Sequence, residues 1–129
     1  MIQIGQTGTA KRIVTESDTA KRIKSGTLPV FATPVLSALM EEAAVNALAP
    51  SLEKGETTVG GYIAVTHKAP TLPGRKIHAV ASVTAAEGRK ISLSITAFEG
   101  EKEIGRADHI RFIVKEEDFI KKLASSEVK

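Results

Sequence analysis

The chain has 129 residues, a net charge of +3 and no cysteine. This length suits one domain with one hydrophobic core over residues 1–129, and the lack of cysteine excludes disulfides, thiolate metal sites and a cysteine nucleophile. Aromatic residues make up only 4% of the chain, which disfavours a binder of single-stranded nucleic acid because such proteins stack bases on aromatic side chains. The N-terminus has no signal-like pattern, and no apolar run nears the roughly 18 residues that span a bilayer. We therefore expect a cytoplasmic protein that binds neither nucleic acid nor membrane.

The first half of the chain predicts a strand, a short helical turn and a long helix. Residues 4–15 favour a strand, and residues 16–19 favour a single helical turn. Residues 33–49 carry seven apolar side chains at helical spacing, with Thr33 as the expected N-cap and Pro34 as the expected first helical residue. Three of the seven are alanine. Because small side chains let a sheet approach closely, we expect this helix to be buried.

The second half predicts four strands and a short helix. Apolar and polar residues alternate over 57–67, 75–86, 90–98 and 102–114, and turn sequences join the last three segments. Residues 116–123 favour an amphipathic helix, and residues 125–129 a frayed end. A long alanine-rich helix followed by a curled antiparallel sheet, about five strands in all, indicates the α+β class and the hotdog fold, in which the sheet wraps the helix. Such a sheet leaves an exposed edge that a second copy commonly pairs.

Two polar residues of the long helix are candidates for chemistry. Thr33 and Glu41 are eight residues apart and share one stripe of the helix. On a helical wheel Glu41 lies at the border of the apolar face, whereas Glu42 points away, so Glu41 is the carboxylate to expect in a site. Two plain alternatives stay open: Thr33 caps the helix and does nothing else, and Glu41 is a boundary carboxylate satisfied by water or a neighbouring N–H.

The three histidines differ in their expected surroundings. His67 shares a strand face with Ile63 and Val65, so it points towards the helix from the mouth of the sheet, where an imidazole can act as a general base. The alternative for His67 is a hydrogen-bonded structural histidine. We expect His78 to face solvent. His109 lies two residues before Arg111, so both share a face, and we interpret that pair as surface, with a contact to an acyl carrier as the alternative.

The segments FATP, LMEEA, ALAP and VTHKAPTLPG resemble the fluoroacetyl-coenzyme A thioesterase family of hotdog enzymes. With weaker similarity further on, the resemblance covers about residues 28–115. It implies that Thr33, Glu41 and His67 form the catalytic set of an acyl-CoA thioesterase. Glu41 would attack the thioester or activate water, Thr33 would position it and His67 would act as the base. The family also implies a homodimer with a pocket between the subunits, and neither a metal nor a separate cofactor, because coenzyme A is part of the substrate.

The same resemblance implies a set of substrate-binding residues: Phe31, Gly60, Gly61 and Arg111. The chain departs from the fluoroacetyl enzyme at Pro34, where that enzyme has glycine, and in the segment SGTLPV, which lacks its aromatic residues. We therefore expect a short or small acyl-CoA other than fluoroacetyl-CoA as the substrate. Two alternatives of similar fold remain: a non-catalytic dimer that binds acyl-CoA, and a dehydratase that acts on a hydroxyacyl thioester.

Overall fold

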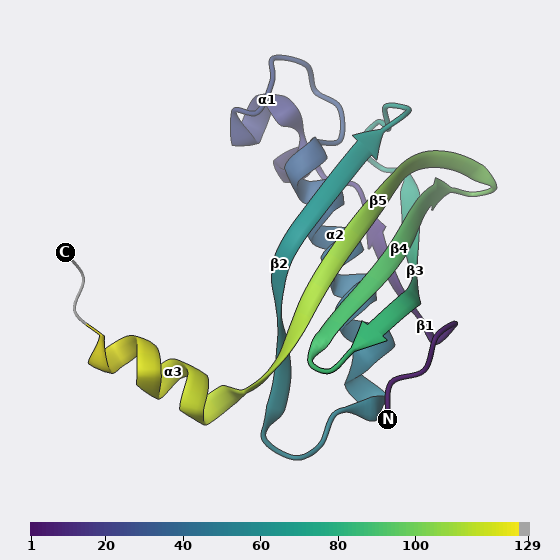
Figure 1. Ribbon diagram of the computed structural model, residues 1–129. Helices are drawn as coiled ribbons and strands as arrows, with labels where there is room; N and C mark the ends of the chain where they lie inside the picture. The colour runs from purple at the N-terminus through teal and green to yellow at the C-terminus, as the bar shows by residue number, and fades with distance from the viewer. Residues whose placement is uncertain (127–129) are drawn as a thin grey trace.

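A computed structural model describes residues 1–126 as one long helix held in a curled sheet (Figure 1). The strand and helix order agrees with the sequence prediction, and each predicted strand begins or ends within a few residues of the observed one. Of the predicted frayed end, Ser125 closes the last helix and residues 127–129 lie outside the described residues. The elements are β1 (Thr7–Ile13), a 3₁₀ turn (Glu16–Asp18), α1 (Ala20–Ile23), α2 (Thr33–Leu48), a 3₁₀ turn (Ala49–Ser51), β2 (Glu56–His67), β3 (Lys76–Glu87), β4 (Lys90–Glu99), β5 (Lys102–Lys115) and α3 (Glu116–Ser125).

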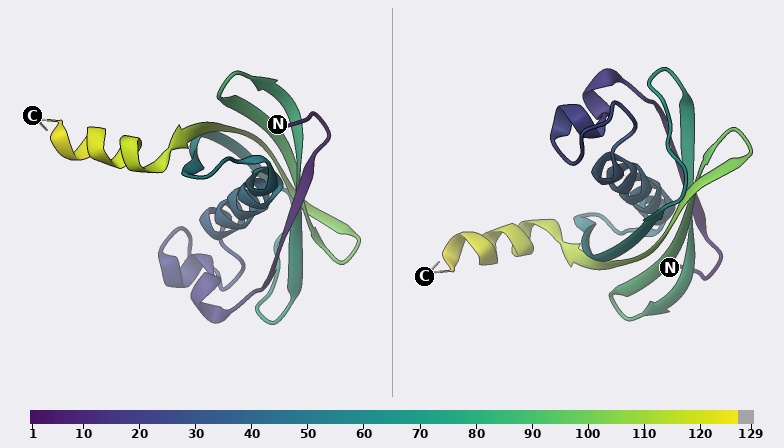
Figure 2. Two further views of the ribbon diagram at one scale, coloured as in Figure 1. Left: turned by 90° about the horizontal axis from the view of Figure 1, so that it is seen from below. Right: turned by 90° about the horizontal axis from the view of Figure 1, so that it is seen from above.

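The five strands form one antiparallel sheet in the order β1-β3-β4-β5-β2. The sheet curls around α2, which lies along its concave face (Figures 1 and 2). This arrangement confirms the predicted α+β hotdog fold. The two edges of the sheet are β1 and β2, and β2 runs antiparallel to β5 along its whole length.

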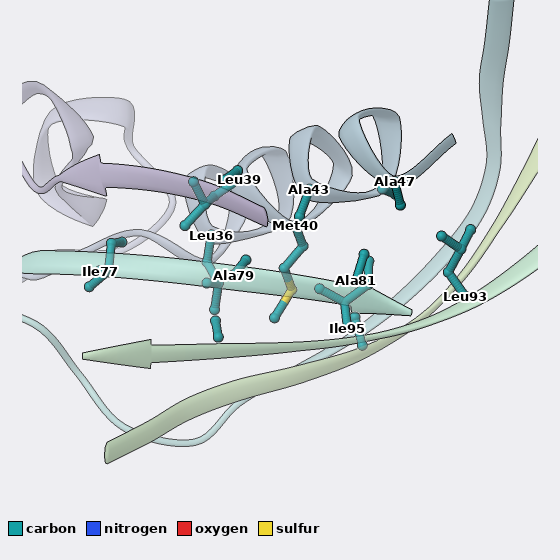
Figure 3. Close-up of a cluster of buried hydrophobic side chains, with 14 of the residues drawn as sticks. Leu36, Leu39, Met40, Ala43, Ala47, Ile77, Ala79, Ala81, Leu93 and Ile95 are labelled. Atoms are coloured by element: carbon teal, nitrogen blue, oxygen red, sulfur yellow. The ribbon is translucent and has the colours of Figure 1, made fainter. Parts of the chain in front are cut away.

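The core lies between α2 and the concave face of the sheet (Figure 3). The predicted apolar stripe of the helix is fully buried, and it packs on inward-facing residues of β3 and β4. The helix supplies Leu36, Leu39, Met40, Ala43, Ala44, Ala47 and Leu48, and the strands supply Ile77, Ala79, Ala81, Val83, Ile91, Leu93, Ile95 and Ala97. Burial of large apolar side chains is the main stabilising contribution of this layer.

Backbone contact between α2 and β1 explains the alanines. A Cβ atom placed on Gly8 of β1 would lie 2.1 Å from the backbone nitrogen of Ala47 and 2.6 Å from the carbonyl oxygen of Ala43. No side chain fits in that space, so β1 requires glycine there and α2 requires small residues facing it. The prediction of a buried helix approached closely by a sheet is confirmed.

The start of α2 differs from the prediction. Ala32, not Thr33, is the N-cap, and no side chain caps the helix. The carbonyl of Ala32 accepts from the backbone N–H groups of Val35 and Leu36, while its own N–H donates to the carbonyl of Asp18. Thr33 is therefore the first helical residue, and its hydroxyl is left for another partner. Within residues 1–126, no helix is long and apolar enough to cross a membrane.

Candidate active site

A pocket of about 300 Å³ opens where the first turn of α2 meets the end of β2. Its walls come from three places: the α1 region and the loop after it, the start of α2, and the segment that follows β2. Its lining residues are Ala20, Ser25, Val30, Phe31, Thr33, Pro34, His67, Lys68, Ala69 and Pro70. Two of the three predicted catalytic residues therefore line one pocket.

Thr33 and His67 are directly hydrogen-bonded, with 2.8 Å between the threonine Oγ1 and the imidazole Nδ1. The other ring nitrogen of His67, Nε2, is buried and makes no hydrogen bond within residues 1–126. Burial is the main reason that the pKa of His67 lies below its ordinary value of 6.5. The ring is therefore neutral at neutral pH and able to accept a proton, and Nδ1 is the ring atom through which it reaches the pocket.

The segment before α2 is hydrogen-bonded to two other segments of the chain, which fixes the position of Thr33. The backbone N–H of Phe31 donates to the carbonyl of Thr71 at 2.8 Å, and that of Ala32 donates to the carbonyl of Asp18 at 2.9 Å. Asp18 is itself held by a two-pronged ion pair with Arg12, which lowers the pKa of the Asp18 carboxyl to about 2. The loop that carries Thr33 is thus tied to the β1 side of the molecule.

Phe31 is buried beside Thr33 and His67 and lines the same pocket; its predicted role in binding substrate stays a prediction. Its ring approaches the His67 ring edge-on, with centroids 6.3 Å apart and an interplanar angle of 81°. This contact packs the imidazole against an apolar surface and contributes to the burial that keeps it neutral.

Glu41 belongs to a second polar cluster, in the third turn of α2. Its carboxylate Oε2 lies 3.4 Å from the Arg111 guanidinium nitrogen Nη1, and the side chain is 42% exposed. The wheel-based prediction that Glu41 lies at the border of the buried face and Glu42 outside it is confirmed. No hydrogen bond joins Glu41 to Thr33 or His67 within residues 1–126 of one chain. Eight helical residues separate Glu41 from Thr33, about 12 Å along the axis.

The remaining bonds of the Arg111 guanidinium go to buried groups. Its Nε donates to the Thr58 hydroxyl at 2.9 Å, and its Nη2 donates to the Thr58 carbonyl at 3.1 Å. Arg111 is only 6% exposed. Its donors are therefore committed to protein groups, which favours a role in holding Glu41; the predicted role in binding substrate stays a prediction.

The surface interpretation of His109 is wrong, because this residue is 1% exposed. Its Nδ1 lies 2.7 Å from the Tyr62 carbonyl, which only accepts, so Nδ1 carries the proton. Its Nε2 is then free to accept from Arg111 Nη1 at 3.1 Å. Burial lowers the pKa of His109, in keeping with a neutral ring. The alternation pattern misplaced it because the inner face of β5 carries this polar pair among apolar residues.

Neither glycine of β2 lines the pocket: Gly60 lies beside the second cluster, and Gly61 faces the ring of Phe112. A Cβ on Gly60 would lie 2.8 Å from Glu41 Oε2 and 3.3 Å from Arg111 Nη1. Gly61 falls at a break in the β2–β5 register, next to the ring of Phe112. Gly60 thus makes the space that the carboxylate occupies, and the predicted substrate-binding role of both glycines stays a prediction.

Sequence reasoning did not find Thr58, and it found His109 with the wrong surroundings. The available signal was the spacing of His109 and Arg111, two residues apart on one strand, together with Gly60 and Gly61 on the neighbouring strand. Gly60 pairs with Arg111 in the sheet register. Because glycine has no side chain, the large Arg111 side chain on the neighbouring strand has room to turn towards the interior.

Solved structures place this fold among the hotdog thioesterases. A crystal structure of the fluoroacetyl-CoA thioesterase FlK superposes with a TM-score of 0.90 at 33% identity, covering 99% of both chains. A thioesterase superfamily member from Thermus thermophilus superposes with a TM-score of 0.86 at 28% identity, covering 96% of this chain and 94% of that one.

Sequence comparison narrows the class further. The model of the fluoroacetyl-CoA-specific thioesterase family matches residues 14–117, and the chain belongs to this family. A fluoroacetyl-CoA thioesterase from Streptantibioticus cattleyicolor is 43% identical over 90 residues, which are 70% of this chain and 65% of that relative. The matched part thus spans less than two thirds of the relative's length. The resemblance seen in the sequence motifs is confirmed at the level of the family.

Proposed function

We propose that this protein is an acyl-CoA thioesterase that hydrolyses a small acyl-CoA to the free acid and coenzyme A. The observation that carries the proposal is the 2.8 Å hydrogen bond between Thr33 and a neutral His67 in the wall of a pocket. Membership of the fluoroacetyl-CoA-specific thioesterase family supports the same activity.

The bonding of His67 suggests the path of the proton. Because Nε2 is buried, the ring accepts a proton through Nδ1, and the Thr33 hydroxyl stands on that atom. When a nucleophile attacks the thioester carbonyl, its proton passes to His67 Nδ1, either from Thr33 itself or from a water through the Thr33 hydroxyl. The imidazolium then returns the proton to the departing CoA thiolate. Thr33 therefore has a part in proton transfer beyond positioning.

Glu41 remains in the proposal as the second acid–base group. Its carboxylate Oε2 lies 3.4 Å from Arg111 Nη1, a charge-assisted contact that orients it for attack on a thioester or activation of a water. Which of the two routes operates is tested by single turnover in ¹⁸O-labelled water. Label in the protein carboxylate indicates attack by Glu41, followed by attack of water on the glutamyl carbonyl of the mixed anhydride. Label in the released acid alone excludes that path and indicates attack of water on the acyl carbonyl, in the thioester or in an acyl intermediate.

The size of the pocket favours a small acyl group. Structures of FlK include a variant in complex with fluoroacetate and CoA and a variant in complex with acetyl-CoA. In this chain, the segment SGTLPV over residues 25–30 contributes Ser25 and Val30 to the pocket wall and no aromatic ring. We propose a short acyl-CoA without a requirement for fluorine.

A homodimer in the cytoplasm completes the proposal. The β2 edge is twelve residues long, and residues 57–66 carry no charged side chain. The other edge, β1, carries Lys11 and Arg12. A long uncharged edge favours pairing with another strand, whereas charged residues oppose it. We therefore assign pairing to β2, with the two copies related by a two-fold axis, which light scattering tests as a doubled molar mass.

A thiol-release screen tests the activity. Since the chain has no cysteine, a thiol reagent detects only released coenzyme A. We expect turnover of acetyl-, propionyl- and butyryl-CoA by the wild type and its loss in Thr33→Val and His67→Ala. Saturable binding without thiol release would instead identify a non-catalytic binder, and dehydration of a hydroxyacyl-CoA without thiol release would identify a dehydratase.

A further inference from the structure

Within residues 1–126, the C-terminal helix α3 meets its own chain mainly at its start, beside the end of β5. It leaves the end of β5 and extends away from the sheet, beyond the β2 edge, on the side where α2 lies (Figures 1 and 2). The hydrogen bonds of its side chains are local, from Ser125 to the Lys122 carbonyl and from Ser126 to the Leu123 carbonyl. Phe119, Ile120 and Leu123 are 37%, 59% and 58% exposed.

A short helix with exposed apolar side chains is stabilised by packing on another surface. Helix α3 has ten residues, and isolated helices shorter than about 12 residues are marginal in water. Its apolar residues follow helical spacing, and its first turn carries Glu116, Glu117 and Asp118. The helix therefore offers an apolar side and an acidic end to whatever lies beyond the β2 edge.

The proposed dimer places a second copy at that edge. In an antiparallel β2–β2 pair with its two-fold axis at Gly61 or Tyr62, Glu56 of one subunit lies opposite residue 66 or 68 of the other, because paired numbers sum to twice that of the central residue. Lys115, which leads into α3, pairs with Glu56 in its own sheet. The start of α3 thus meets the His67 end of the partner's β2.

The same geometry excludes a contact of α3 with its own pocket. The two features lie at opposite ends of β2, twelve residues and roughly 40 Å apart. Figure 1 shows α3 at one end of the strand and α1, which helps to line the pocket, at the other.

The partner's pocket offers chemistry that complements α3. Leu28 and Leu72, in the two segments that flank the pocket, are 64% and 54% exposed. Lys68 lies in the pocket wall, and Lys24 ends α1 nearby. Apolar groups on both surfaces, with acidic residues on α3 and basic ones around the pocket, favour contact.

We propose that α3 of each subunit covers the mouth of the partner subunit's Thr33–His67 pocket, so that each active site is completed in trans. This rests on the homodimer of the proposed function. The surface that the apolar side of α3 covers belongs to a second copy of this chain. The role of α3 is to close the partner subunit's pocket over the bound thioester.

Cross-linking tests the contact without any assay of activity. The cysteine-free chain allows a Leu72→Cys/Ile120→Cys double variant treated with a bismaleimide linker. We expect a covalent dimer from the double variant and markedly less from either single variant. A cross-link confined to one chain, or dimer yields equal to those of the single variants, would overturn the proposal.

Mixed dimers test the role in catalysis. In homodimers of Ile120→Ser/Leu123→Ser we expect KM to rise about tenfold, the effect of losing a small apolar contact with a substrate site. Pairing this chain with a His67→Ala chain that keeps its own α3 leaves one competent pocket, and that pocket faces an intact helix. Wild-type KM with half the turnover per dimer is expected.

The matched control carries all three substitutions in one chain and pairs it with a wild-type chain. The single competent pocket then faces the altered helix, and KM should rise as in the altered homodimer. If KM follows a chain's own α3, or ignores α3 altogether, the inference fails while the thioesterase assignment stands. An inactive wild type would refute the assignment, and the cross-link would still decide where α3 lies.

Discussion

The two polar clusters on α2 differ in how fully their hydrogen bonds are satisfied. Thr33 and His67, at the first turn, share one hydrogen bond and leave a buried imidazole nitrogen without a partner in the part of the chain that the structure describes. Arg111 of β5, near the third turn of α2, is hydrogen-bonded to Thr58, His109 and Glu41. The first cluster lines a pocket and the second fills the space beneath a glycine of β2.

This difference separates residues that can react from residues that hold others in position. A group whose partners are few can change its protonation state and its bonds during a reaction. A buried arginine with all its neighbours in place is held rigidly, and losing one partner leaves a charge without compensation. We therefore expect changes at Thr33 and His67 to affect rate, and changes at Arg111 to affect stability.

Removing either member of the first cluster should have the largest effect. Thr33→Val and His67→Ala are expected to lower kcat about 10²- to 10⁴-fold, the range for loss of a general acid–base group, with a small change in unfolding free energy. Steady-state thiol release and urea unfolding measure the two quantities. A variant that stays folded and keeps wild-type kcat would remove that residue from the catalytic set.

Breaking the second cluster should act mainly on the folded state. Arg111→Met is expected to lower the unfolding free energy by about 3 kcal/mol, because it leaves Glu41, Thr58 and His109 without their donor. Arg106→Met is the matched control: its ion pair with Glu103 is exposed, so its loss should lower the unfolding free energy far less than Arg111→Met. Equal losses of unfolding free energy in the two variants would show that the buried cluster stabilises the fold no more than an exposed ion pair does.

Filling the space beside Glu41 should have a smaller effect. Gly60→Ala places a methyl group 2.8 Å from the carboxylate oxygen, and the resulting displacement is expected to cost about 1 to 2 kcal/mol. In the Glu41→Ala background the same substitution should cost much less, since the obstructing oxygen is gone. A double-mutant cycle measures this coupling, and a coupling of zero would contradict the close approach.

The pH dependence should show the smallest effect. The pKa of His67 is lowered by burial, and the neutral ring is the active base. The rate therefore rises with pH through a pKa below 6.5 and is level at neutral pH. A kcat/KM profile from pH 4.5 to 8 measures this limb. A limb above pH 7 would mean that the imidazole is not buried as described, or is not the base.

Much of the fold was predictable because its patterns are local. Alternation located the four strands after α2, and helical spacing located α2 together with the border position of Glu41. The N-cap was misplaced by one residue because Ala32 is held in place by the bond from its N–H to the carbonyl of Asp18, 14 residues earlier, which no local rule detects. His109 was misassigned because the carbonyl that holds its ring belongs to Tyr62, 47 residues away in the chain.

The pocket was only partly predictable. Strand alternation turned His67 towards α2, which brought it to Thr33. The separation of Glu41 from that pair follows from the length of two helical turns, which the spacing of eight residues already contained. The predicted single domain over residues 1–129, the absence of a cofactor and the roles of the site residues stay predictions, and the kinetic experiments above address the roles of the site residues.

The close approach of Gly8 to α2 also fixes how the helix lies on the sheet. With the backbone of β1 against the backbone of α2 at Ala43 and Ala47, no flexible side chain lies between the two elements to absorb a shift. A side chain at position 8 would displace the helix from the sheet, and the first turn of α2, which carries Thr33, would move with it. One glycine in β1 therefore sets the depth at which the Thr33 end of the helix lies against the sheet.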